Sequence, residues 1–318
     1  MTYKAAFLDA GSVGDADLTP LQQLNLQLQL YPFTRPEQIL ARLQGCHIAL
    51  VNKVPLDAST IQQLPELRYI AVTATGTNNI DLNAAKAAGI KVQNVSAYAS
   101  ASVAQHVFAM LLHFTNQCHS FDQSIRQGHW SNSPHFCLLA HPMQELADQT
   151  MTIVGYGALG QATARLAHAF GMTVCIAERP EATRCRPGRL PFAQALAQAD
   201  VLSLHCPLTE DNQHLIGAEQ LALLKPTAIL INTARGELVD SHALLQALQQ
   251  NQLGAAALDV LEQEPPPLQH RLLQQPHPRL LLTPHVAWAS LAARNRLIAY
   301  TARQLNSWLQ QHPADSKE

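Results

Sequence analysis

A glycine pattern near the middle of this 318-residue chain limits the folds that it can adopt; it lies in the stretch MTIVGYGALGQATARLAHAFGM, which begins at residue 151. Gly155, Gly157 and Gly160 directly follow a short apolar run and open a run of good helix formers. Between a strand and a helix, this G-x-G-x-x-G spacing is typical of a dinucleotide-binding βαβ unit, although the same glycines could make a tight turn without a ligand. We therefore predict that a pyrophosphate binds at the N–H groups that begin the helix.

The strand that follows indicates which dinucleotide binds. MTVCIAERP contains Glu178 at the end of the predicted strand, 23 residues after Gly155. This is near the spacing of about 20 residues expected for the acid that binds the adenosine ribose. A carboxylate there accepts hydrogen bonds from the ribose hydroxyls and repels a 2′-phosphate, so the predicted cofactor is NAD. Arg179 is the complication, because an arginine beside that position could pair with the phosphate of NADP. The basic run RPEATRCRPGR over 179–189 is either a solvated loop or a neighbour of the cofactor.

The length and the position of the glycine unit predict two domains. The chain is about twice the usual domain length of about 150 residues, and roughly half of it precedes the glycine unit. Short apolar strands alternate with helical runs in both halves, which indicates parallel sheets with helices on both faces. The predicted fold class is therefore α/β throughout.

In the first half, strands are expected in YKAAFLDA, NLQLQLYPF, HIALVN and PELRYIAVTATG, and helices in RPEQILARLQGC and over 78–92, with Gly89 at the C-terminal end of the latter. A single long apolar helix is expected over 101–125. Its surplus of apolar residues would suit a domain-connecting or subunit-facing helix, and burial in a core is the alternative.

After residue 150 the alternation is clearer. Strands are expected at 151–154, 172–177, 200–204, 227–232, 254–259 and 280–283, and helices at about 158–170, 191–198, 217–224 and 240–250. The tail from residue 289 is predicted to form one amphipathic helix.

Composition excludes several classes of protein. The formal net charge of −2 gives no broad basic field for nucleic acid or an anionic membrane. No apolar run approaches a membrane span, and the N-terminal residues contain no apolar segment of signal length, so a cytoplasmic protein is expected. The six cysteines form no CxxC pair, which fits a reducing compartment. His135, Cys137 and His141 have no metal-ligand spacing, so no metal is predicted.

Three ionisable residues each follow a predicted strand. Arg235 comes after TAILINTA, Glu262 and Glu264 come after GAAALDV, and His285 comes after RLLLTP. Ligands of an open parallel sheet bind outside the carboxyl ends of its strands, so these side chains could converge on a bound cofactor. Each could instead be an ordinary surface, capping or loop residue. Their joint placement behind a credible nucleotide site favours a catalytic role.

The chemistry of these residue types suits the reduction of a 2-keto acid. An arginine can hold the substrate carboxylate in a bidentate contact. A histidine can protonate the carbonyl oxygen near neutral pH, and a carboxylate beside it orients the ring. Arg235, His285 and Glu264 would fill these three roles.

INTARGELVD, ALDVLEQEPPP and LLTPHVAWAS, with IVGYGALG upstream, resemble the D-isomer-specific 2-hydroxyacid dehydrogenase family over nearly the whole chain. The resemblance implies that Arg235, Glu264 and His285 are catalytic, Glu264 being chosen over Glu262 because the family's acid directly precedes the proline. It implies that TATGTNNID is a substrate loop, with backbone N–H groups near Thr75 and Gly76 holding the substrate carboxylate, and that Asp259 contacts the nicotinamide carboxamide. Trp288 either walls the substrate pocket or packs between domains. The expected cofactor contacts are Gly155, Tyr156, Gly157, Ala158, Leu159, Gly160, Glu178, Pro207, Thr233, Ala234 and Asp259.

The resemblance also implies a domain arrangement. A Rossmann-type doubly wound NAD-binding domain over 101–287, which includes a dimerisation segment, would be inserted in a flavodoxin-like substrate domain made of residues 1–100 and 288–318. Closure of the cleft between the domains would exclude water and bring the substrate loop over the nicotinamide. The family expectation is a homodimer formed through the region around 101–150.

Within the family, ATGTNNIDL, AERP and PHVAWAS look most like NADH-dependent hydroxypyruvate reductases, also called glycerate dehydrogenases. Glyoxylate and phenylpyruvate reductases stay open as alternatives. The same fold also occurs in corepressor-type proteins that sense NAD without significant turnover, so a non-catalytic function is the alternative from a different class.

Overall fold

The computed structural model describes residues 2–313, which divide into two compact units. One unit comprises the chain up to Ala99 together with the chain from Ala289 onward, and the other is Ser100–Trp288. The second unit is therefore an insertion in the first, and each is described by itself below. The sequence placed these two boundaries after residues 100 and 287.

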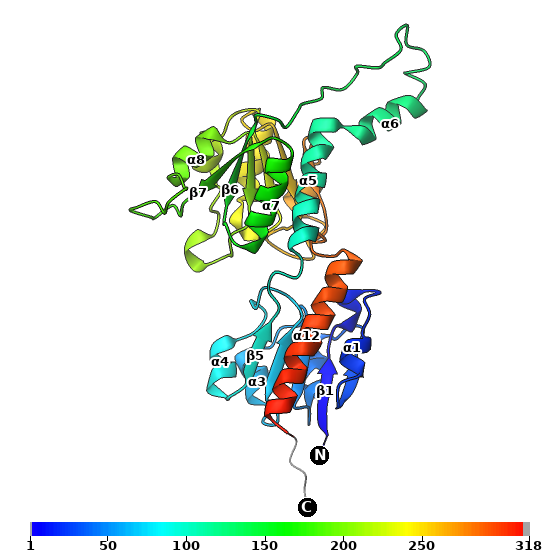
Figure 1. The fold of residues 1–318 in the computed structure, drawn as a ribbon, viewed down its shortest axis with the longest axis vertical. Coiled ribbons are helices and arrows are strands. Elements are labelled where there is room, and N and C mark those ends of the chain that lie inside the picture. Colours follow the sequence, from blue (N-terminus) through cyan, green and yellow to red (C-terminus); the bar gives the residue numbers. More distant parts are fainter. Residues whose placement is uncertain (1, 314–318) are drawn as a thin grey trace, which may run out of the picture. The chain divides into compact units, whose positions relative to one another are not determined.

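The first unit is a five-stranded sheet flanked by helices (Figure 1). All its neighbouring strands are parallel, in the order β2-β1-β3-β4-β5, which is the order of flavodoxin-like folds. Its strands are β1 (Tyr3–Phe7), β2 (Leu26–Leu30), β3 (Ile48–Val51), β4 (Tyr69–Val72) and β5 (Lys91–Asn94). Its helices are α1 (Thr19–Gln22), α2 (Ile39–Leu43), α3 (Ala58–Gln62), α4 (Leu82–Ala87) and α12 (Leu291–Gln311), with 3-10 turns at Ala10–Val13 and Pro36–Gln38.

Burial along these strands explains the sequence patterns. The central strands β3 and β4 are buried at all four positions, so they are continuously apolar, whereas the edge strand β2 alternates Leu and Gln. Helix α12 packs onto this sheet through Trp308, whose ring lies 5.3 Å from that of Tyr3 and 5.1 Å from that of Tyr69. The C-terminal helix therefore belongs to the same core as the N-terminal strand.

The second unit is a six-stranded parallel sheet in the order β11-β10-β9-β8-β6-β7. Its strands are β6 (Thr150–Val154), β7 (Thr173–Ala177), β8 (Val201–Leu204), β9 (Ile229–Asn232), β10 (Ala255–Leu258) and β11 (Leu280–Leu282). Its helices are α5 (Ser100–Asn116), α6 (Cys118–Arg126), α7 (Ala158–Ala169), α8 (Phe192–Gln198), α9 (Ala218–Leu223), α10 (Ser241–Gln249) and α11 (Arg271–Gln274), with 3-10 turns at Glu210–Asn212 and Gly236–Leu238. An isolated bridge joins Leu190 to Ala177 beyond β7, where a Rossmann sheet has its third strand.

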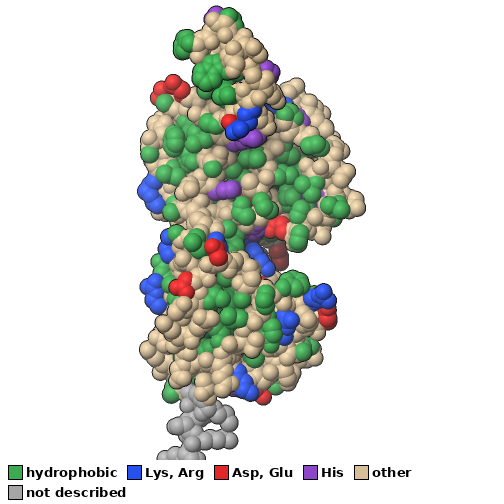
Figure 2. Space-filling view, turned by 90° about the vertical axis from the view of Figure 1, so that its right-hand side faces the viewer, with side chains coloured by type: hydrophobic (Ala, Val, Ile, Leu, Met, Phe, Trp, Pro, Cys, Tyr) green, Lys and Arg blue, Asp and Glu red, His purple; other side chains and the backbone are tan. Residues whose placement is uncertain are grey.

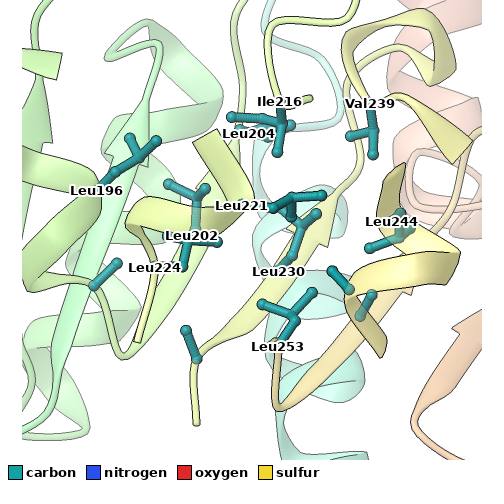
Figure 3. Close-up of a cluster of buried hydrophobic side chains, with 14 of the residues drawn as sticks. Leu196, Leu202, Leu204, Ile216, Leu221, Leu224, Leu230, Val239, Leu244 and Leu253 are labelled. Carbon is teal, nitrogen blue, oxygen red and sulfur yellow. The ribbon is translucent and has the colours of Figure 1, made fainter. Parts of the chain in front are cut away.

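The core on one side of this sheet is built almost entirely from aliphatic side chains (Figure 3). Leu202 and Leu204 of β8 and Leu230 of β9 meet Leu196 of α8, Leu221 of α9 and Leu244 of α10, and all are buried. On another face α5 packs against α7, and Phe108 stacks on Phe170 with a ring separation of 4.9 Å. The predicted strands and helices of 151–283 are confirmed, with ends that shift by no more than two residues.

The helices expected over 78–92 and 101–125 were wrong in extent. The helix expected over 78–92 is only α4, because Gly89 takes a left-handed φ of +70° and the chain then enters β5. The helix expected over 101–125 is broken at Gln117, which has a φ of 51° and whose Nε2 donates to Pro142 O at 2.8 Å. The apolar surplus of the first part, α5, is accounted for by core burial.

Among the described residues, no helix combines the length and the hydropathy that crossing a bilayer requires.

A buried histidine follows β8. The backbone N–H of His205 donates to Val154 O at 2.7 Å, its Nε2 lies 2.9 Å from Ser203 Oγ, and its Nδ1 is buried without a hydrogen-bond partner among the described residues. Burial lowers the pKa of His205 to about 4, because the charged ring would lose its hydration. The folded protein therefore holds this ring neutral where the unfolded chain would protonate it.

This difference predicts a pH-dependent loss of stability. Between about pH 6.5 and pH 4 the unfolded chain binds a proton at His205 that the folded chain does not, so the free energy of unfolding falls as the pH falls through this window. In His205→Asn this contribution is absent, and the loss of stability between pH 7.5 and pH 5 should be smaller than in the wild type. Urea unfolding of the cofactor-free protein at the two pH values measures it, and equal losses in both proteins would contradict the expectation.

Candidate active site

The glycine loop is shaped by close backbone approaches. Gly155 has a φ of +94°, and a Cβ there would lie 2.4 Å from the backbone nitrogen of Cys206. A Cβ on Gly160 would lie 2.2 Å from Gly155 O, so helix α7 can pack against β6 only if this residue is glycine. At Gly157, by contrast, a Cβ would meet nothing within 4 Å. The loop therefore presents its backbone to open space at the second glycine.

The start of α7 is available for an anion. Gly157 is the N-cap residue and supplies no side-chain hydrogen bond to the first N–H groups of the helix. A cavity of about 480 Å³ lies in front of this turn, lined by Gly155, Tyr156 and Gly157, by Glu178 after β7, and by His205 and Pro207 after β8. These residues fit the pyrophosphate and adenosine half of NAD.

Of the remaining predicted cofactor residues, Ala158 and Leu159 begin α7 and do not line this cavity, and four others are buried on the same unit. Gly160 is buried within α7, and Ala234 is buried after β9. Thr233 has a buried Oγ1 without a hydrogen-bond partner among the described residues, so a ligand could supply one. Asp259 is 1% exposed, and its carboxylate accepts hydrogen bonds from residues of the segment 283–287.

Glu178 lies at the predicted strand end, and its carboxylate is paired with an arginine of the following loop. Its side chain is 3% exposed and forms an ion pair with Arg186. Hydrogen bonds from the Arg186 guanidinium, with backbone N–H groups of Arg186 and Arg179 adding to them, hold the pKa of Glu178 far below its usual range. Arg179, the residue that the sequence suggested could pair with the phosphate of NADP, donates only its backbone N–H to Glu178. Arg186 contacts Glu178 through its charged guanidinium as well.

His285 and Glu264 form a close pair. Nδ1 of His285 lies 2.5 Å from Oε2 of Glu264, and Oε1 of Glu264 accepts from the backbone N–H of Leu261 at 3.1 Å. Because a carboxylate can only accept, Nδ1 carries the proton and Nε2 is left for a substrate. Glu262 instead accepts from the backbone N–H and Oγ of Ser241, so of the two neighbouring acids it is Glu264 that contacts the histidine.

The segment that carries His285 is held by Asp259. The backbone N–H of His285 donates to Asp259 O at 2.7 Å, while the Asp259 carboxylate accepts from Thr283 Oγ1, Val286 N and Ala287 N. His285 has a φ of 54°, an uncommon conformation for a residue with a side chain, and these bonds hold it there. Trp288 Nε1 donates to His285 O at 2.9 Å, so the tryptophan braces the same turn.

Arg235 follows β9, which lies beside β10 in the sheet. The buried Asn232 side chain ties this turn together, since its Nδ2 donates to Arg235 O at 2.7 Å and its Oδ1 accepts from Ala234 N at 3.0 Å. Gly236 is needed next, because a Cβ there would lie 1.9 Å from the carbonyl carbon of Leu261. Arg235, Glu264 and His285 thus follow the carboxyl ends of three adjacent strands, β9, β10 and β11.

The predicted substrate loop lies on the other unit, after β4. Thr75 Oγ1 donates to Val95 O at 3.0 Å, and Thr75 O accepts from Asn94 Nδ2. These bonds fix the loop against the end of β5 and use the side chain and the backbone carbonyl of Thr75.

Sequence reasoning did not single out Asn232, His106 or Arg186. His106 Nε2 lies 3.0 Å from Thr283 Oγ1 and 3.6 Å from Asp259 Oδ1, and it comes from the distant helix α5. A polar residue at the last position of an apolar strand is a usable signal for Asn232. The basic run over 179–189 was a signal for Arg186, but the path of the loop decides which arginine reaches the acid.

Comparison with known proteins identifies the group to which these motifs belong. Residues 108–287 match the NAD binding domain of the D-isomer specific 2-hydroxyacid dehydrogenases. The chain is 44% identical to a glycerate dehydrogenase of Methylorubrum extorquens, over 92% of each chain, and 33% identical to a hydroxypyruvate reductase of Blautia hydrogenotrophica, over 95% of each chain. The crystal structure of a glyoxylate reductase from Paecilomyes thermophila superimposes with a TM-score of 0.81 at 26% identity, covering 98% of this chain and 97% of that one.

The match to the NAD binding domain spans more than half of the chain, and the relatives align over nearly its full length. A catalytic dehydrogenase is therefore favoured over a nucleotide sensor without turnover. The chain belongs to the D-isomer specific 2-hydroxyacid dehydrogenase family and is an NAD-dependent oxidoreductase of small 2-keto and 2-hydroxy acids.

Proposed function

We propose that this protein reduces hydroxypyruvate to D-glycerate with NADH. The observation that carries the catalytic part is the pair of His285 and Glu264, 2.5 Å apart at the carboxyl ends of adjacent parallel strands. The choice of substrate is supported by the glycerate dehydrogenase and hydroxypyruvate reductase among the relatives. It is also supported by the motifs around Thr75, Glu178 and His285.

His285 is the general acid in this proposal. Nε2 of the protonated ring gives its proton to the carbonyl oxygen of the keto acid, and in the reverse direction the neutral ring takes it back. Glu264 accepts from Nδ1, so it keeps the ring in one orientation and offsets its positive charge. NADH, when bound, supplies the hydride that the carbonyl carbon receives.

Arg235 is assigned to hold the substrate carboxylate by its guanidinium, and the family resemblance assigns the same role to the N–H groups near Thr75 and Gly76. Trp288, braced on His285 O, forms a wall of the substrate pocket. On the cofactor side, the glycine loop from Gly155 to Gly160 holds the pyrophosphate. Pro207, Thr233 and Ala234 line the path of the dinucleotide, and Asp259 lies at its nicotinamide end.

Initial rates with hydroxypyruvate, glyoxylate and phenylpyruvate, each with NADH, test the substrate. Hydroxypyruvate should give the highest kcat/KM, because a glycerate dehydrogenase and a hydroxypyruvate reductase are among the relatives that align over nearly the whole chain. A higher kcat/KM for glyoxylate would show that glyoxylate is the preferred substrate, and the proposed reduction of a 2-keto acid would still stand. If no keto acid turned over while NADH still bound, the proposed activity would be wrong.

Two substitutions separate the neighbouring acids and the histidine. His285→Ala should lower kcat by about 10²–10⁴-fold, because the general acid is lost, while the Kd of NADH changes little. Glu264→Gln should lower kcat at least tenfold, because the ring loses its charged partner. Glu262→Gln is the matched control: this acid binds Ser241 and should affect kcat little. Equal effects of the two glutamine variants would refute the assignment of Glu264.

The proposed assembly is a homodimer formed through residues 118–145, here called the arm. The arm carries helix α6 and is tied internally by bonds from Trp130 Nε1 to Phe136 O and between Ser124 and His141. Its large apolar side chains are exposed, with Phe136 91% and Leu139 80% accessible, and hydrophobic atoms are visible on it at the top of Figure 2. Exposed apolar surface of this kind marks an interaction site, and a second copy of the chain is the proposed partner.

Sedimentation equilibrium tests the assembly. The wild type should be a dimer, and the double variant Phe136→Asp, Leu139→Asp should be monomeric, because it places two charges in the apolar contact. Leu268→Asp is the control, since Leu268 is also 80% exposed but lies outside the arm. A monomeric wild type would refute the proposal.

The proposed location is the cytoplasm, in keeping with six cysteines that are all free thiols.

A further inference from the structure

The hydrogen-bonding capacity of Glu178 is fully used by the protein. Its Oε1 accepts from the backbone N–H of Arg179 at 2.9 Å and from Nη2 of Arg186. Its Oε2 accepts from Nε of Arg186 at 2.8 Å and from the backbone N–H of Arg186 at 3.1 Å. A carboxylate has about four lone-pair sites, so none is left for the two hydroxyls of an adenosine ribose.

The surroundings of this carboxylate are also rich in arginine. Nη1 of Arg189 lies 3.7 Å from Oε1 of Glu178, and Arg179, Arg186 and Arg189 are all among the residues that line the same cavity. Glu181 and Asp211 line it as well, so positive charge is concentrated at Glu178 while the cavity as a whole is balanced. A buried acid that normally repels a phosphate is here covered by guanidinium groups.

Arg186 is the solvent-exposed member of this ion pair. Its side chain is 51% exposed and lies on the loop between β7 and α8, whereas Glu178 is 3% exposed. A ribose with a free 2′-hydroxyl must displace the Arg186 fork before Glu178 can accept from it. A ribose 2′-phosphate needs no such displacement, because it can pair with the guanidinium edge that does not contact Glu178.

We propose that Arg186 masks Glu178 and thereby gives the adenosine ribose site dual specificity, so that the protein binds NADPH as well as NADH. This inference rests on the proposed function only for the identity of the dinucleotide site. It adds a specificity-determining residue eight positions beyond the acid that usually decides the cofactor. Glu178 can accept hydrogen bonds from the ribose of NADH only when the Arg186 guanidinium no longer contacts it.

Isothermal titration calorimetry of the whole protein with NADH and with NADPH tests the inference. The two Kd values of the wild type should lie within about tenfold of each other. Arg186→Gln should tighten NADH binding, because Glu178 is unmasked, and weaken NADPH binding, because a cation is lost. The ratio of the two Kd values should then shift by at least tenfold in favour of NADH.

Two further variants make the result specific. Arg186→Lys keeps the charge but cannot make the two-pronged contact through Nε and Nη2, so it should retain NADPH binding and still tighten NADH. Arg184→Gln is the matched control, since Arg184 lies on the same loop and is exposed. It should leave both Kd values unchanged.

Three outcomes would overturn the inference: wild-type binding of NADPH more than 100-fold weaker than that of NADH, a Kd ratio that Arg186→Gln does not change, or no binding of either dinucleotide. Because no keto acid is present in the titration, a failure of the proposed hydroxypyruvate reaction is seen separately in the rate assays. Circular dichroism spectra of the variants show whether their folds are kept.

Discussion

The active site depends on the buried carboxylate of Asp259. This group lies at the carboxyl end of β10 and binds three donors of the chain that follows β11, namely Thr283 Oγ1, Val286 N and Ala287 N. Its backbone carbonyl adds a fourth bond, from His285 N. A buried charge is tolerated only when its oxygens are satisfied, so the loop and the acid fix each other. The left-handed turn that aims His285 at Glu264 is a consequence of this anchor.

Charge pairing organises both ends of the NAD-binding unit, in two different ways. At one end, Glu264 meets a single histidine and leaves Nε2 for a substrate, which is an arrangement suited to proton transfer. At the other end, Glu178 meets the guanidinium of Arg186 on both oxygens, which is suited to controlling access rather than to chemistry. The two acids have similar sequence settings, each just past a strand, and differ in what the following loop brings to them.

The strands and helices from 151 to 283 could be predicted closely, because apolar strands, helix formers and turn residues alternate sharply there. The break at Gln117 could not be predicted, because the left-handed residue is held by a contact with Pro142, far along the chain. Gly89 was visible as a helix end, but the strand after it is short, and its residues Lys91 and Gln93 are polar. Tertiary contacts override local preference at such places.

Three patterns along the chain establish the type of protein: the glycine spacing after an apolar strand, the acid at the next strand end, and the order of Arg235, Glu264 and His285. The partner of Glu178 emerges only in three dimensions, where Arg186 contacts it rather than the adjacent side chain of Arg179. The contact of His285 with Glu264 agrees with the choice of that acid over Glu262 that the family resemblance implied. Strand ends are set by local patterns, whereas a contact between side chains depends on the path of the loops that carry them.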